Sequence, residues 1–251
     1  AKVFPNALVQ FEDFANQNAY RLLEKYRNHY CCFNDDIQGT GSVVLAGLFT
    51  AMKNLKSSLS EQRILFYGAG SAGLGIAEDI TRAKEMAGLN SQNAKENIYL
   101  FDSRGLVVKG RDHLTPNKEQ FAHPIEGETN FLEVVHQLKP TVIIGVAGQP
   151  NVFTKAVIKA MATENDHPII FALSNPTTKS ECTAEEAYRW SDGKAIFASG
   201  SPFNSVEYKG KTFHPGQGNN AYIFPGLGLG IVISRSSRVV DEMLVIAAQM
   251  L

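Results

Sequence analysis

The sequence predicts an α/β fold, a doubly wound and mostly parallel sheet with flanking helices. From residue 63 onward, short apolar runs alternate with helix-length segments, which is the order expected of βαβ units. A glycine-rich turn directly follows the first of these runs. The chain has 251 residues, of which 44% are hydrophobic, and this is enough apolar material for one sizeable core. We therefore expect residues 1–251 to form one large domain.

Five apolar runs are predicted to be the strands of this sheet. They are residues 63–67, 97–101, 141–146, 168–173 and 195–198. Helices are predicted where apolar residues recur with helical spacing, or where a long segment is apolar nearly all round. These segments are 14–30, 42–56 (buried), 72–87, 129–137, 154–163, 183–190 and a last helix from residue 238. The stretch from 204 to 220 is polar and rich in turn residues.

Composition and charge exclude several classes of protein. Lys and Arg total 24 against 25 Asp and Glu, so the excess positive charge typical of nucleic-acid binders is absent. Since no run of about 18 apolar residues occurs, we expect no membrane association. Cys31, Cys32 and Cys182 fit neither an even disulfide framework nor a CxxC metal motif. This favours a reducing, intracellular compartment.

Both ends of the sequence lead us to expect a longer protein. The chain begins without Met on an extended segment, with no signal peptide. It stops at Leu251 within a predicted helix, with no Gly, Asn or Pro stop signal. We expect a preceding domain and a C-terminal tail to be missing.

The glycine-rich turn predicts a dinucleotide site of the Rossmann type. Gly68, Gly70 and Gly73 form a GxGxxG motif between a predicted strand and a predicted helix. In this position the first glycine makes the turn, the second lets pyrophosphate approach the backbone, and the third lets helix and strand pack closely. The N–H groups at the helix start then bind the anion. The predicted contact residues are Gly68, Ala69, Gly70, Ser71, Ala72 and Gly73.

An acidic residue is expected at the end of the second strand, where it would contact the cofactor ribose, and Asp102 lies there. The alternative is that Asp102 only caps the following turn. Ser103 and Arg104 follow it directly, and Lys118 lies further on. Since cations and small hydroxyls favour a ribose 2′-phosphate, we predict NADP ahead of NAD.

Two short blocks place carboxylates in otherwise apolar surroundings. Glu12 and Asp13 lie in VQFEDF, and Asp35 and Asp36 lie in CFNDDIQGTG. Three such oxygens together with water and substrate oxygens would suit Mg²⁺ or Mn²⁺. The alternative is helix capping, because both blocks precede predicted helices. Spacing alone favours capping.

Two asparagine-containing loops follow predicted strands on the side where ligands of open α/β sheets bind. Asn175 lies in ALSNPT, and Asn219 and Asn220 lie in PGQGNN. Asparagine can orient a carboxylate or a nicotinamide amide without adding charge. The alternative is that these residues only form turns.

Taken together, the motifs resemble the C-terminal part of the malic enzyme family. QFEDF, FNDDIQGT, GAGSAG, ALSNPT, ASGSPF and GQGNN occur in this order from about residue 9 to residue 241. The resemblance implies that Glu12, Asp13 and Asp36 are ligands of a divalent metal, which reverses the preference for capping. Asp35 would lie beside them in the active site.

The resemblance also assigns the asparagines and the cofactor residues. Asn175 and Asn220 match substrate-contacting positions, and Asn219 matches a position next to the nicotinamide. Asn175 is also expected to face the cofactor. A Lys at the position of Lys118 is similar to NADP-using members of the family.

The implied reaction is oxidative decarboxylation of (S)-malate to pyruvate and CO₂ with reduction of NADP or NAD. The general base and acid of the family are a Lys and a Tyr of an N-terminal domain, and no segment of this chain matches them. We therefore expect this chain alone to be inactive. The alternatives are a malolactic enzyme that makes lactate, and a cofactor-binding module without catalysis. The resemblance further implies a homodimer or homotetramer for the full-length enzyme. For localisation we predict an intracellular protein, in the cytoplasm ahead of the mitochondrial matrix or the plastid.

Overall fold

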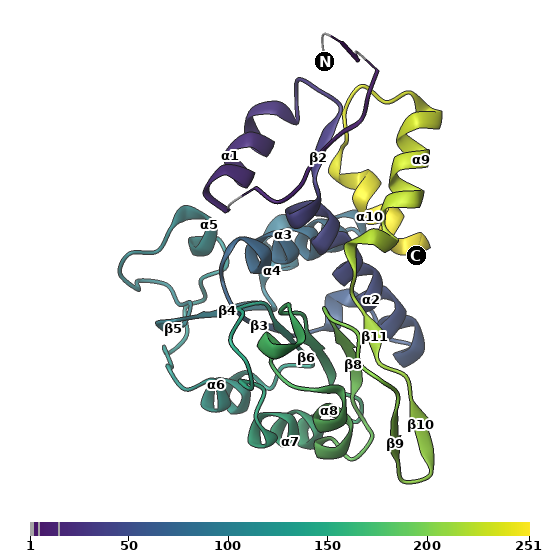
Figure 1. Ribbon diagram of the computed structural model, residues 1–251. Helices are drawn as coiled ribbons and strands as arrows, with labels where there is room; N and C mark the ends of the chain where they lie inside the picture. Colours follow the sequence, from purple (N-terminus) through teal and green to yellow (C-terminus); the bar gives the residue numbers. More distant parts are fainter. Residues whose placement is uncertain (1–2, 5, 15) are drawn as a thin grey trace.

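The computed structural model describes residues 3–4, 6–14 and 16–251 (Figure 1). Within these residues the main sheet has seven strands in the order β11-β8-β7-β6-β3-β4-β5. Every neighbouring pair is parallel except β4 and β5, which are antiparallel. The strands are β3 (Ile64–Tyr67), β4 (Ile98–Asp102), β5 (Gly105–Leu106), β6 (Val142–Gly145), β7 (Ile169–Ala172), β8 (Ile196–Ser199) and β11 (Gly216–Gln217).

Helices cover both faces of this sheet (Figure 1). On one face lie α2 (Thr40–Leu55), α3 (Ser71–Met86) and α10 (Asp241–Met250). On the other face lie α6 (Phe131–Leu138), α7 (Lys155–Glu164) and α8 (Ala184–Trp190). The remaining helices are α1 (Asn16–Tyr26), α4 (Ser91–Lys95), α5 (Pro116–Glu119) and α9 (Phe224–Ser234). Among the described residues, no helix combines the length and apolar character needed to cross a bilayer.

The alternation of side chains along each strand divides the core into two layers. In β3, Ile64 and Phe66 pack with the α2 and α3 face, whereas Leu65 packs with the α6 and α7 face. Because successive side chains of a strand point to opposite faces, a strand covered on both faces must be apolar throughout. All three of these side chains are fully buried. This explains why the predicted strands are continuous apolar runs rather than alternating ones.

The predicted fold class is confirmed, and the five predicted strands match β3, β4, β6, β7 and β8 to within one or two residues. Helix α9 was not predicted, because Gly226, Gly228 and Gly230 interrupt its apolar pattern. The turn-rich stretch before it contains a hairpin of β9 (Val206–Tyr208) and β10 (Lys211–Phe213). The predicted helix 14–30 is α1, which ends at Tyr26; residue 15 lies outside the described residues.

A second, two-stranded sheet brings the N-terminal segment beside the residues that precede α2. Strands β1 (Val9–Phe11) and β2 (Cys32–Asn34) are parallel, and Phe11 is paired with Asn34. Since paired parallel strands end at the same edge, the residues that follow Phe11 and Asn34 emerge side by side. Helix α1 is the connection between the two strands.

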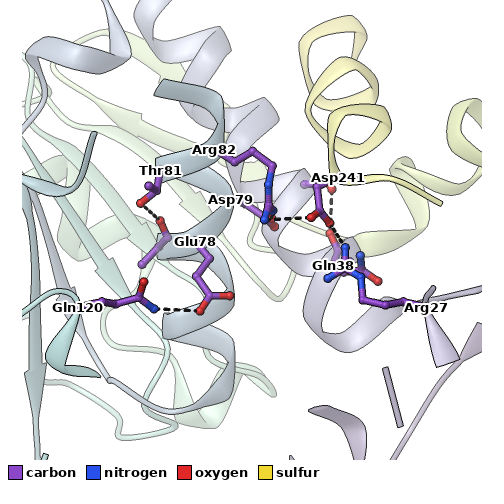
Figure 2. Close-up of polar contacts among 10 residues, drawn as sticks. Arg27, Gln38, Glu78, Asp79, Thr81, Arg82, Gln120 and Asp241 are labelled. Carbon is purple, nitrogen blue, oxygen red and sulfur yellow. Dashed lines mark hydrogen bonds and ion pairs between the residues drawn. The ribbon is translucent and has the colours of Figure 1, made fainter. Parts of the chain in front are cut away.

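Charged side chains join α1 and α10 to α3 (Figure 2). Asp241 at the start of α10 accepts from Arg27, which follows α1, and from Arg82 of α3, whose Nη2 lies 2.9 Å away. Arg82 also lies 3.5 Å from the Asp79 carboxylate. The ion pairs therefore hold the connection between β1 and β2 against the helix that follows the glycine-rich turn.

Candidate functional site

A cavity of about 490 Å³ lies at the carboxyl ends of β3, β4 and β6. This is the point where the strand order reverses, since the chain passes from β3 to β4 on one side and returns to β6 on the other. Ligands of doubly wound sheets bind at this switch point. The lining residues come from the last residues of β3 and β4 and from the segments that follow the three strands: Tyr67, Gly68, Ala69, Gly70, Ser71, Ala72, Phe101, Asp102, Ser103, Lys118, Val146, Ala147 and Gln149.

Glycine is required at different positions of the turn for different structural reasons. Gly68 has a φ of 119°, and a Cβ there would lie 3.0 Å from the Ala147 nitrogen. A Cβ on Gly73 would overlap the Gly68 carbonyl oxygen, so this glycine lets α3 pack against the turn. A Cβ on Gly70 would meet nothing within 4 Å, and its position faces open space at the start of α3. The turn thus leaves room for an anion at the helix N-terminus.

Asp102, at the end of β4, binds two cationic side chains. Its Oδ2 lies 2.7 Å from Arg111 Nη2 and 2.6 Å from Lys118 Nζ. Its Oδ1 accepts from the Arg104 backbone N–H at 2.9 Å. Burial alone would raise the pKa of Asp102, but the hydrogen bonds from Arg111, Lys118 and the Arg104 backbone outweigh it and lower the pKa to about 2. The carboxylate is therefore ionised across the neutral range.

The residues predicted around Asp102 occupy different places. Ser103 and Lys118 line the cavity, as do Gly68 to Ala72. The Arg104 side chain is exposed and is not among the lining groups; its backbone supports Asp102 instead. Arg111 was missed by the sequence reasoning, because nothing in its spacing distinguishes it from other surface cations.

The carboxylates of Glu12, Asp13 and Asp36 converge although two sequence blocks supply them. One oxygen from each lies within 4.8 Å of the others. Glu12 and Asp13 directly follow β1, and Asp36 follows β2, so the parallel pairing of these strands produces the convergence. The Asp13 backbone N–H donates to Asp36 Oδ2 at 3.0 Å and fixes the two blocks together. Three oxygen donors in one place fit a hard divalent cation such as Mg²⁺ or Mn²⁺.

Asp35 lies beside this cluster, and one of its two carboxylate oxygens is unpaired within the described part of the chain. It is 3% exposed, and its Oδ1 has no hydrogen-bond partner among the described residues. Burial raises the pKa of Asp35 to about 6; the hydrogen bond from Asn220 opposes this rise, while the charges of Glu12 and Asp36 add to it. A buried, unpaired carboxylate oxygen next to three more carboxylates is costly without a cation or donor nearby. The donor set therefore fits a bound metal.

Helix capping is the alternative role for Asp35 and Asp36, which begin a single π-helical turn, Asp35–Gly39, before α2 (Thr40–Leu55). The N-cap is Asn34, whose Oδ1 accepts from the Ile37 N–H at 2.9 Å. Asp36 uses its carboxylate for Asp13 rather than for this turn. Capping by a neighbouring residue thus leaves Asp35 and Asp36 available to a ligand.

A second cavity, of about 300 Å³, joins the carboxylates to the asparagine loops. Its walls come from the N-terminal sheet, from the loops after β7 and β8 and from the turn before α9: Glu12, Asp35, Asn175, Gly200, Gly218, Asn219, Asn220, Ala221 and Phe224. Asn220 Nδ2 donates to Asp35 Oδ2 at 3.2 Å, and Ser201 Oγ donates to Asn175 Oδ1 at 2.7 Å. Asn175 and Asn219, predicted to face the cofactor as well, line this cavity rather than the glycine-rich one.

Comparison with known proteins assigns the family. Residues 37–251 match the family model described as "Malic enzyme, NAD binding domain". The chain belongs to the malic enzyme family. The NADP-dependent malic enzyme of Mus musculus is 53% identical over 247 residues, which cover 98% of this chain and 43% of the mouse protein. The chloroplastic NADP-dependent malic enzyme of Solanum lycopersicum is 54% identical over 246 residues, 97% of this chain and 43% of that protein.

Solved malic enzyme structures share the fold. The Entamoeba histolytica malic enzyme superposes with a TM-score of 0.75 at 28% identity, covering 96% of this chain and 46% of that one. The malic enzyme of Pyrococcus horikoshii gives a TM-score of 0.73 at 27% identity, covering 96% and 52%. The resemblance to malic enzymes predicted from the motifs is thus confirmed. The chain spans less than half the length of the mouse and tomato relatives.

Proposed function

We propose that this chain is the cofactor-binding and metal-binding part of a longer malic enzyme. That enzyme converts (S)-malate to pyruvate and CO₂ and reduces NADP⁺, or less readily NAD⁺, with Mg²⁺ or Mn²⁺. One observation carries the proposal: the carboxylates of Glu12, Asp13 and Asp36 meet beside a cavity that also contains Asp35 and asparagines from two loops. A cation site next to a substrate site suits decarboxylation of a β-keto acid, because a divalent cation stabilises the enolate that loss of CO₂ leaves.

Glu12, Asp13 and Asp36 would hold the cation through one oxygen each. When bound, a divalent cation polarises the hydroxyl and carbonyl groups of a substrate and stabilises an enolate. Asp35 supplies a fourth carboxylate on the cavity wall, with an oxygen free to accept a proton or a hydrogen bond. We assign the general base and acid to the rest of the longer protein.

Asn220 and Asn175 would orient the substrate. Asn220 donates to Asp35 and accepts from Thr40 Oγ1 at 3.2 Å, so its amide plane is held from both sides. Asn175 is held by Ser201. Amide groups fixed in this way can bind a carboxylate without adding charge to an already acidic cavity. We also propose that Asn219 faces the nicotinamide.

The cofactor would bind in the cavity at the switch point, with pyrophosphate at the glycine-rich turn. We propose NADP because Asp102 on the cavity wall is paired with two cations, Lys118, which also lines the cavity, and Arg111, which does not line it. The net positive charge there suits a 2′-phosphate. The relatives from mouse and tomato are named NADP-dependent.

The reaction is tested in the full-length enzyme with malate, NADP⁺ and Mn²⁺, by measuring NADPH, CO₂ and pyruvate together. We expect equal amounts of all three, and loss of the reaction in Asp36→Asn with retention in Glu24→Gln, an exposed acid on α1 (Asn16–Tyr26). Lactate without net NADPH would instead indicate the malolactic reaction. Cofactor binding without turnover would indicate a binding module. The 251-residue chain alone should form no NADPH.

We also propose an assembly and a location for the longer protein. We propose a homodimer or homotetramer for the full-length enzyme, which light scattering after gel filtration tests. Cys31, Cys32 and Cys182 form no disulfide, in keeping with a reducing compartment. We propose the cytoplasm ahead of the mitochondrial matrix and the plastid. Enrichment in an organelle fraction would contradict this assignment.

A further inference from the structure

Glu181 is a fully buried carboxylate at the carboxyl ends of β6 and β7. Its exposure is 0%, and it lies in the segment between the loop after β7 and helix α8. Gly145, the last residue of β6, leaves the space that its side chain occupies: a Cβ on Gly145 would overlap the Glu181 side chain. Buried acids without a partner are rare in proteins, so the contacts of this group need an explanation.

The groups around the Glu181 carboxylate are all donors. The Ser174 hydroxyl donates to Oε1, and the Ser174 backbone N–H donates to Oε2 at 3.3 Å. Burial raises the pKa of Glu181, and hydrogen bonds from Ser174 and from backbone N–H groups, including that of Ala147, oppose the rise. The Ser174 hydroxyl in turn accepts from the Gly148 N–H at 2.8 Å. The carboxylate thus fixes Ser174 of the loop after β7, and the Ser174 hydroxyl in turn binds the loop after β6.

The main chain of the same residue strengthens this connection. The Glu181 carbonyl accepts from the Phe153 N–H at 3.0 Å, and the preceding carbonyl of Ser180 accepts from the Asn151 N–H at 3.2 Å. Both donors lie further along the loop after β6. The segment around Glu181 is therefore fixed to that loop by side-chain and main-chain hydrogen bonds.

These two loops line different cavities. Val146, Ala147 and Gln149 of the loop after β6 line the cavity at the glycine-rich turn. Asn175 of the loop after β7 lines the cavity with the carboxylates. Ser174, which Glu181 holds by two bonds, is the residue directly before Asn175. Glu181 itself lines neither cavity.

We propose that Glu181 is a positioning residue that holds the cofactor loop and the substrate loop in one fixed relation, so that its loss weakens both binding sites together. This proposal rests on the proposed function, because it takes the two cavities as the cofactor and malate sites. A residue with a purely structural role would lower stability without changing either affinity in the folded protein.

The test uses Glu181→Gln and Glu181→Met in the full-length enzyme. Gln keeps one acceptor oxygen and places an N–H₂ group among donors, whereas Met keeps the length and removes both acceptors. NADPH affinity is measured by nucleotide fluorescence, and malate affinity by calorimetry with Mn²⁺ present. We expect Gln to weaken both affinities three- to tenfold, and Met to weaken both more. If Met does not fold, the Gln variant alone decides.

Three control variants separate positioning from general destabilisation. Val157→Ala creates a cavity in the core on the same side of the sheet, outside both sites, and should lower the melting temperature without changing either affinity. Ser201→Ala releases only Asn175 and should weaken malate alone. Tyr67→Phe removes only the hydroxyl that donates to Gln149 at 3.0 Å, and should weaken NADPH alone.

The proposal is overturned if folded Glu181→Gln keeps both affinities within twofold of wild type, or if only one of them changes. A wild-type enzyme that binds NADPH but neither binds nor oxidises malate would overturn the proposed function instead. These two failures are distinguished by the wild-type measurement, which is made before any variant.

Discussion

The guanidinium of Arg111 binds the carboxylate of Asp102 through two nitrogens, Nη1 to Oδ1 at 3.1 Å and Nη2 to Oδ2 at 2.7 Å. A bidentate pair of this kind fixes the orientation of both groups. With its lone pairs engaged by Arg111 and Lys118, the Asp102 carboxylate is poorly placed to accept from a free ribose hydroxyl. At this proposed site for the 2′-phosphate, the two cations bound to Asp102 therefore outweigh its single negative charge.

Replacing Lys118 by Gln should remove most of the preference for NADP over NAD. A hydrogen bond to a charged group contributes about 1.5–3 kcal/mol, which corresponds to a roughly 10- to 100-fold loss of NADP affinity. Dissociation constants of both nucleotides, measured by fluorescence quenching at low and high salt, test this. The wild-type preference should weaken at high salt because a charge pair is screened. Lys109→Gln, an exposed cation outside the cavity, is the matched control. Equal affinity of the wild type for NAD and NADP would contradict the assignment.

Replacing Arg111 by Met should allow the Asp102 carboxylate to bind the cofactor ribose. The carboxylate loses its bidentate partner and becomes available to a ribose hydroxyl, so NADP affinity should fall about tenfold while NAD affinity stays within about threefold. Titration of both nucleotides in Arg111→Met and Arg104→Met tests this, because the Arg104 side chain is exposed and only its backbone N–H binds Asp102. If both nucleotides were weakened equally, Arg111 would only support the fold.

Much of this site could be predicted from short sequence patterns, because the contacts that require these residues lie close together in the sequence. Gly68 and Gly73 are required by backbone geometry within one strand-turn-helix unit, so their spacing carries the information. Asp36 and Glu12 could be assigned to one site only through the family resemblance. Their convergence depends on the pairing of β1 with β2, whose paired residues are 23 positions apart, and sequence spacing does not predict this pairing. Spacing alone favoured capping, and Asn34 is the residue that caps the turn.

Other residues could not be predicted because their role depends on tertiary contacts. Arg111 and Glu181 lie in segments without any motif of their own, and each acts through a partner from another loop. Helix α9 has too many glycines for its apolar pattern to indicate a helix. For such residues the sequence gives the type of side chain, but only the folded structure shows which residue it contacts.

Glu12→Gln and Asp36→Asn should each weaken Mn²⁺ binding by about 10- to 100-fold, because each removes one of the three proposed carboxylate ligands. Removing a charge from this cluster also relieves repulsion between like charges, so both variants should be at least as stable as wild type without metal. Mn²⁺ affinity is measured by electron paramagnetic resonance of free Mn²⁺, with Glu24→Gln as the control. Unchanged affinity in both variants would remove the metal site from this cluster.

The buried side chain of Lys84 should make the free energy of unfolding depend on pH. It is 1% exposed, and its Nζ has no hydrogen-bond partner among the described residues. Burial lowers the pKa of Lys84 from 10.5 to about 8. Below pH 8 the lysine is protonated in both states and the folded state carries the full cost of the buried charge. Between pH 8 and 10.5 the folded state releases its proton first, so the free energy of unfolding rises with pH.

Lys84→Met should therefore raise the free energy of unfolding at pH 7, by on the order of 2–3 kcal/mol, and abolish the rise between pH 8 and 10.5. Urea unfolding at several pH values measures both effects. Lys159→Met, at an exposed position on α7, should leave the stability and its pH profile nearly unchanged. A lower stability of Lys84→Met at pH 7 would show that the ammonium has a stabilising partner.

The ion pair of Arg82 with Asp241 should contribute measurably to stability, unlike the surface pairs of this chain. Their side chains are 32% and 17% exposed, and Asp241 also binds Arg27, so the charges form a partly buried network between three segments (Figure 2). By contrast, Arg189 and Glu185 lie one turn apart on α8 and are 48% and 62% exposed. Exposed pairs of this kind contribute about 0.3–0.5 kcal/mol.

A double-mutant cycle on Arg82→Met and Asp241→Asn should give a coupling energy of roughly 1–2 kcal/mol, against a few tenths for Arg189→Met and Glu185→Gln. The single change Asp241→Asn should be the more destabilising of the first pair, because it leaves two guanidinium groups without their shared partner. Urea unfolding measures the four free energies of each cycle. Coupling in the Arg82 and Asp241 pair no larger than in the exposed pair would mean that α10 is held to α3 by its apolar contacts alone, chiefly through Val245 and Ala248.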